Sequence, residues 1–261
     1  MPELLIYALI GVVAGASAGL FGIGGGLVVV PALLLAFQQQ GVDPAIAPHL
    51  AVGTSLATVV ITGSAAAWGH YRQGAVETPL LRRLLAGLVP GAAGGVALAS
   101  ALDGDVLQRL FAVFLLGAAI HAALDRGTRQ GTGGQRLPAG IAGGGIGTVS
   151  TLVGIGGGTL TVPYLAWRGC AIHRAVGTAA ATAPGIGIVG ATGYIIGGWG
   201  QPGLPDAAAG YIHLGALAGI AATSPATSLA SARLAHRIPA RLLRRLFAAV
   251  LAAVALRLLL G

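Results

Sequence analysis

The chain has 261 residues, of which 55% are hydrophobic and 8% are charged, and its mean hydropathy is +0.85. This composition excludes a soluble globular protein and predicts an all-α polytopic membrane protein. The fifteen basic residues are all arginines, and with seven acidic residues they give a formal net charge of +8. In so apolar a chain this excess indicates anchoring at the cytoplasmic face rather than binding to nucleic acid. Cys170 is the only cysteine, so an intramolecular disulfide and a cysteine metal cluster are excluded.

The first half of the chain starts with an apolar element that glycines interrupt. Residues 4–21 and 27–37 are apolar, and Gly22-Ile23-Gly24-Gly25-Gly26 lies between them. The element begins like a signal peptide, but it has no positive residue before it and leads directly into the glycine motif, so we expect it to be structural. After a polar turn, three apolar runs come near the roughly 20 residues that cross a bilayer. They lie at 45–68, 84–101 and 106–124.

The second half repeats this plan after a polar stretch at 125–136, whose composition is that of a flexible linker. A second broken element at 137–167 carries GIGGG at 154–158, and apolar runs follow at 175–198, 207–229 and 240–260. Other motifs recur as well, with AVGT at 51–54 and 175–178 and RLFA at 109–112 and 245–248. These landmarks predict an N-terminal repeat at 1–124, a linker at 125–136 and a C-terminal repeat at 137–261. Internal repeats are a common way of building transporter folds.

The arginines bear on whether the second repeat is inverted. If each broken element crosses the membrane, the two sides hold seven and eight arginines, which gives no bias. If each broken element instead enters and returns on one side, each repeat has a broken helix and three crossings. Thirteen arginines then share one side, with Arg109 and Arg257 opposite. Cytoplasmic loops are rich in arginine, so the inverted arrangement is favoured. Residues 4–21 are long enough to cross alone, which leaves the crossing alternative open.

The two GIGGG breaks are the candidate binding site. Glycine within a helix costs about 1 kcal/mol relative to alanine, and in lipid the freed backbone groups need partners in protein, water or ligand. Each break starts a new half-helix, whose unpaired N–H groups favour an anion. Inversion would bring both breaks to a shared midplane. Close helix packing is the alternative role, and it is the favoured one for isolated GxxxG pairs such as Gly91 and Gly95.

Polar side chains in the following spans could complete an anion site. Thr54, Ser55 and Thr178 offer hydroxyls, although hydrogen bonds within their own helices are the alternative. His49 and His173 lie about one turn before the AVGT glycines, and they could instead be interfacial residues. The candidate substrate-binding residues are Gly22, Gly24, Gly25, Gly26, Thr54, Ser55, Gly154, Gly156, Gly157, Gly158, Thr159, Thr178, His49 and His173.

Other chemistries have no supporting pattern. The predicted spans contain no Asp or Glu, so proton coupling through a buried carboxylate is not expected. GIGGG is followed by Leu27 or Thr159 where a phosphate-binding loop needs lysine, and the six histidines do not take metal-ligand spacing. A set of nucleophile, base and acid is not visible. We therefore expect no enzymatic activity, no cofactor and no metal site.

Duplicated GIGGG-x4-P followed by AVGT resembles the TauE/SafE family of sulfite and organosulfonate exporters. The resemblance covers both halves, and it implies a secondary transporter that exports a small sulfur-containing anion across the bacterial inner membrane. Ala179 stands where the first half has Ser55, so the two sites are not symmetric. The alternatives are a transporter or channel for another small solute, and a membrane scaffold or receptor without transport. The expected partners are the small anionic substrate and the lipid bilayer, without nucleic acid, and a homodimer is left open.

Overall fold

A computed structural model describes residues 2–21, 25–124, 137–235 and 240–260, which are mostly helical, as the composition predicts. The helices of the first half are α1 (Pro2–Phe21), α2 (Gly26–Gln39), α3 (Ala47–Arg72), α4 (Thr78–Ser100) and α5 (Gly104–Leu124). Those of the second half are α6 (Ala139–Val153), α7 (Gly158–Trp167), α8 (Ile172–Gly197), α9 (Leu214–Ala235) and α10 (Ala240–Leu260). Two short strands, β1 (Ala208–Ala209) and β2 (Ile212–His213), form an antiparallel hairpin before α9.

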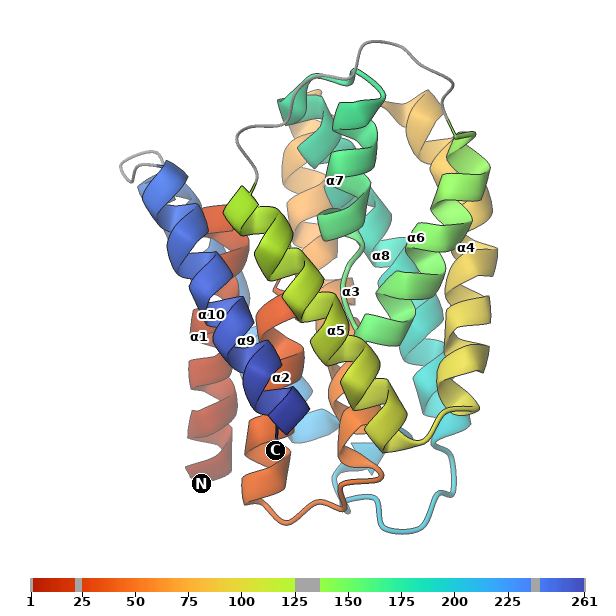
Figure 1. Ribbon diagram of the computed structural model, residues 1–261, viewed down its shortest axis with the longest axis vertical. Helices are drawn as coiled ribbons and strands as arrows, with labels where there is room; N and C mark the ends of the chain where they lie inside the picture. The colour runs from red at the N-terminus through yellow and green to blue at the C-terminus, as the bar shows by residue number, and fades with distance from the viewer. Residues whose placement is uncertain (1, 22–24, 125–136, 236–239, 261) are drawn as a thin grey trace.

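Both apolar elements are interrupted at the glycines. α1 ends at Phe21 and α2 begins at Gly26, while α6 ends at Val153 and α7 begins at Gly158. In Figure 1, α1 rises from the end of the molecule that carries the N-terminus and α2 returns toward that end. α6 and α7 make a similar pair from the opposite end. Among the described residues, four helices are long and apolar enough to cross a membrane: Ala47–Arg72, Thr78–Ser100, Gly104–His121 and Ile172–Gly197.

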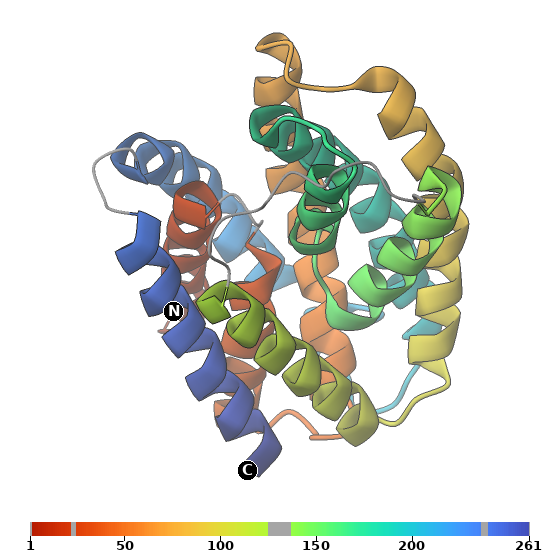
Figure 2. The same cartoon turned by 45° about the horizontal axis from the view of Figure 1, so that its top comes forward.

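The helices pack in pairs that join the two halves of the chain. α1 packs on α9, α4 on α6, α3 on α8, and α5 on α10. Figure 2 shows α5 and α10 side by side. Glycines allow the close approaches, since Gly91 faces the backbone of Gly144 across the α4–α6 contact and Gly95 faces Thr148. This confirms the packing role predicted for Gly91 and Gly95.

The helix pairs are symmetric between the two halves. If each helix is replaced by its counterpart in the other half, the pair α1–α9 becomes α6–α4, while α3–α8 and α5–α10 are unchanged. The inverted relation between the repeats nevertheless stays a prediction. So do the boundaries of the repeats, and the linker at 125–136 lies outside the described residues.

The prediction of an apolar span at 207–229 is wrong at its start. α9 begins at Leu214, and the residues before it form the β-hairpin, in which Ala208 pairs with His213 and Gly210 makes the turn with φ 54°. Ile212 is buried against Ala57 and Ala191. The hairpin is therefore apolar because it packs inside the protein, and hydropathy alone does not distinguish this burial from burial in lipid.

Candidate functional site

The second break is a short irregular segment between two helix ends. Gly154 closes α6 with φ 74°, and Gly157 precedes α7 with φ 75°, a left-handed conformation that costs residues with a Cβ atom about 1–2 kcal/mol. The N–H group of Ile155 donates to the Ser150 carbonyl at 2.9 Å, and that of Thr161 donates to the Gly157 carbonyl at 2.8 Å. The segment therefore ends one helix and starts the next, and the N-terminus of α7 opens inside the molecule (Figure 1).

The second break meets the start of α2 and the middle of α3. A Cβ atom on Gly26 would lie 2.7 Å from the Gly154 carbonyl oxygen, so a side chain at Gly26 would disturb this contact. The hydroxyl of Ser55, which is fully buried, donates to the same carbonyl at 2.7 Å. We call the meeting of Gly26, Ser55 and Gly154 the junction. It brings together three of the predicted site residues.

The other glycines of the two breaks have different surroundings. Gly25 lies beside Ala14 of α1, while Gly22 and Gly24 lie outside the described residues. Gly156 faces Val59 of α3 and Ala183 of α8, so the segment after the junction has apolar walls. Gly158 and Thr159 form the first turn of α7, beside this segment.

The threonine of each AVGT motif accepts a hydrogen bond from a connecting segment of the other half of the chain. Gly53 lies against the Tyr211 carbonyl, and Thr54 Oγ1 accepts a hydrogen bond from the His213 N–H group at 2.9 Å. In the other half, Gly177 lies against Ala75, and Thr178 Oγ1 accepts from the Glu77 N–H group at 3.0 Å.

These two contacts lie at opposite ends of the antiparallel α3–α8 pair. Gly53 faces Tyr194 of α8, and Tyr194 lies sixteen positions after Thr178, a rise of about 24 Å along the helix. The structure therefore separates Thr54 from Thr178, and one small anion cannot touch both in this conformation. Whether either threonine contacts substrate stays a prediction.

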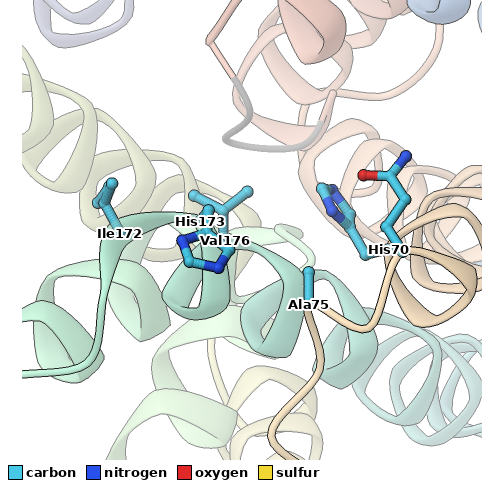
Figure 3. A pocket seen from close by; sticks show the side chains of 6 residues that line it. His70, Ala75, Ile172, His173 and Val176 are labelled. Carbon is cyan, nitrogen blue, oxygen red and sulfur yellow. The ribbon is translucent and has the colours of Figure 1, made fainter.

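The two predicted histidines also lie apart from the junction. His49 is buried, its Nε2 atom lies 3.0 Å from the Ala99 carbonyl oxygen, and its ring stacks on Tyr211 with centroids 5.0 Å apart. His173 lines a cavity of about 350 Å³ together with His70, Gln73, Ala75, Ile172 and Val176. Figure 3 shows His173 and His70 on different sides of this cavity, which lies where α3 ends and α8 begins.

Comparison with known proteins identifies the family. The family described as "Sulfite exporter TauE/SafE" matches residues 7–258, nearly the whole chain. The chain belongs to the TauE/SafE family. It is 37% identical over 223 residues to a probable membrane transporter protein of Haemophilus influenzae. The aligned region covers 85% of this chain and 84% of that relative.

Two further relatives of this TauE/SafE protein are also named as probable membrane transporter proteins. One from Methanocaldococcus jannaschii is 29% identical over 75% of this chain and 72% of its own length. YtnM of Bacillus subtilis is 30% identical over 76% of this chain and 67% of its own length. No solved structure matches the chain. Together with the apolar helices, the family establishes a multi-pass membrane protein of a transporter family.

Two buried hydroxyls beside the second break of this TauE/SafE protein are not among the site residues predicted from the sequence. Ser150 lies in the last turn of α6, and Thr161 lies near the start of α7. Both residues are fully buried, and neither hydroxyl has a hydrogen-bond partner. The signal that could have found them is the comparison of the repeats, because the first half has Ala18 and Val29 at the matching positions.

Proposed function

We propose that this protein is a secondary transporter that exports a small sulfur-containing anion, either sulfite or a short organosulfonate, across the bacterial inner membrane. The observation that carries the proposal is the junction, where the start of α2 meets the break that precedes α7. The N-terminus of a helix favours an anion through its unpaired N–H groups and its dipole. Substrate sites of secondary transporters typically lie where such interrupted helices meet.

The charges of the protein favour recognition by dipoles and hydroxyls. The arginines whose side chains are described lie at or near helix ends and none of them is buried: Arg72, Arg82, Arg83, Arg109, Arg168, Arg174 and Arg257. Arg174 is paired with Glu77 at 3.1 Å. Recognition at the breaks would therefore rely on several diverging N–H and O–H donors. Such donors suit a pyramidal or tetrahedral oxyanion better than a flat carboxylate, which is best bound by the planar fork of an arginine.

Ligand-dependent thermal stability of the purified protein tests the proposal. A ligand that binds only the folded state raises the unfolding temperature through mass action. We expect sulfite or methanesulfonate to raise it more than acetate at equal concentration and ionic strength, which is matched because exposed arginines respond to screening. Tighter binding of acetate than of both sulfur oxyanions would contradict the proposed substrate class.

Counterflow of radiolabelled sulfite into vesicles containing the purified protein then separates transport from binding alone. Accumulation against a preloaded sulfite pool is expected of a transporter. A scaffold or receptor would bind the anion without counterflow, and a channel would let it equilibrate without accumulation. The homodimer stays a prediction that the mass of the protein in nanodiscs would test.

A further inference from the structure

Ser150 and Thr161 carry an unusual pair of hydroxyls. Both side chains are fully buried, and neither oxygen has a hydrogen-bond partner. Several other buried hydroxyls bond to backbone carbonyls, such as Thr58 to Ser55 and Thr182 to Ala179. Burying a hydroxyl without a partner is unfavourable. A role in binding a ligand would explain why this position carries two of them.

The two hydroxyl residues adjoin the same point of the chain, which is the residue before α7. Ser150 Oγ lies 3.4 Å from the position that a Cβ atom on Gly157 would take. Thr161 donates its backbone N–H group to the Gly157 carbonyl at 2.8 Å. Gly157 itself supplies no side-chain cap to the helix. Ser150 Oγ therefore lies beside the N-terminus of α7, and Thr161 belongs to the first turn of that helix, where backbone N–H groups already favour an anion.

The surroundings of this helix start are apolar. Gly156 faces Val59 and Ala183, and Gly157 faces the side-chain ends of Ile146 and Ile186. Hydrogen bonds to an anion are stronger in such a low-dielectric environment than in water. The donors come from two helices, α6 and α7.

We infer that Ser150 and Thr161 are specificity-determining ligands of the transported oxyanion, which they bind together with N–H groups at the start of α7. The inference rests on the proposed function, and it places the polar half of the substrate site at the second break alone. The first break has Ala18 and Val29 at the matching positions, which offer no donor. Its contribution is the contact of Gly26 with the Gly154 carbonyl.

Sulfite affinity of single variants tests this assignment. Ser150→Ala and Thr161→Val remove one hydroxyl each and keep the shape of the side chain nearly unchanged. Each is expected to weaken sulfite binding by about tenfold or more, the effect of losing a hydrogen bond to a charged group. The unfolding temperature without ligand should stay the same or rise, because an unpaired hydroxyl is removed. The variants are made singly, so that a folding failure of one leaves the other as the test.

Ser224→Ala is the matched control. The Ser224 hydroxyl is also buried and without a partner, but it lies in α9 at the contact with α1, beside Gly15. Its removal should leave sulfite affinity unchanged. If the wild-type protein binds sulfite and both Ser150→Ala and Thr161→Val bind it equally well, the assignment fails while the proposed function stands. If the wild-type protein binds neither sulfite nor methanesulfonate, the proposed function itself fails. An equal loss of affinity in Ser224→Ala would also overturn the assignment, because the effect would not be local.

Discussion

The two GIGGG breaks share a sequence but differ in chemistry. In the first break, the positions beside the glycines are Ala18, Leu27 and Val29, and the last two are buried in the main apolar core. In the second break, the matching positions are Ser150, Thr159 and Thr161. The glycines interrupt a helix in both halves, whereas these three positions carry hydroxyls only at the second interruption. The difference teaches that the glycine motif determines where the backbone breaks, while the neighbouring side chains determine whether the break can bind an anion.

The helices that carry the AVGT motifs extend the same contrast. Ser55 of α3 donates to the Gly154 carbonyl and so ties the second break to the first half of the chain. Its counterpart in α8 is Ala179, which is buried and has no hydroxyl to offer. The second break is thus bonded to a neighbouring span through a side chain. We interpret the molecule as a duplicated framework with one polar break and one apolar break.

The largest expected effect is an all-or-none difference in labelling, which tests whether the breaks enter from opposite faces. Gln73 and Gln201 are exposed residues of the α3–α4 and α8–β1 connections. In the inverted arrangement they lie on opposite sides of the membrane, because the arginine-rich connections are cytoplasmic. Gln201→Cys should therefore react with an impermeant thiol reagent in intact cells, and Gln73→Cys should react only after permeabilisation. Reaction of both in intact cells, or of neither, would restore the crossing alternative, which puts them on one side.

The background for this labelling should lack Cys170. Burial raises the pKa of the Cys170 thiol, and the nearby Glu77 carboxylate raises it further. The reactive thiolate is therefore scarce at neutral pH, so a silent Cys170 would not report on which side of the membrane it lies. Cys170→Ala removes both this ambiguity and any background signal.

The next largest effect compares the glycines of the two breaks directly. Gly154→Ala places a Cβ atom at φ 74°, which costs about 1–2 kcal/mol, and the new atom meets Val30 and the backbone of Val52, where overpacking costs about 1–3 kcal/mol. Gly25 has φ −71°, and a Cβ atom there lies 3.4 Å from the Ala14 carbonyl oxygen, so Gly25→Ala should be tolerated. Thermal unfolding of both variants in the same detergent measures the difference. Equal destabilisation would show that the two breaks are structurally alike.

The sequence predicts the helical framework well and the site only in part. Glycines and apolar runs locate both broken elements, because a helix with four clustered glycines loses its advantage over an irregular segment. The start of α9 is misjudged, since a hairpin buried in protein has the same hydropathy as one end of a span. The contact of Ser55 with Gly154 joins residues from different halves, so no local pattern reveals it. Thr54 and Thr178 have equivalent places in the sequence, yet the antiparallel packing of α3 and α8 moves them apart.

The smallest expected effect tests whether Thr54 and Thr178 only stabilise the connections that they bond to or also bind substrate. Thr54→Val leaves the buried N–H group of His213 without an acceptor, which costs about 1–3 kcal/mol. Thr178→Val does the same to Glu77, but that bond is only partly buried, so water can replace the acceptor and the cost should be about 1 kcal/mol or less. Thr62→Val is the control, because the Thr62 hydroxyl donates within its own helix to Thr58.

Unfolding temperature and sulfite affinity should be measured on all three variants. If the threonines only stabilise the two connections, the unfolding temperature drops most in Thr54→Val, less in Thr178→Val and least in Thr62→Val. The sulfite affinity of all three variants then stays within about twofold of the wild-type value, below the tenfold that corresponds to one hydrogen bond to a charged ligand. An unchanged unfolding temperature with clearly weaker sulfite binding by Thr54→Val would instead make that hydroxyl a ligand. The polar part of the site would then extend along α3 away from the second break, and the contrast between one polar and one apolar break would no longer describe how this protein recognises its anion.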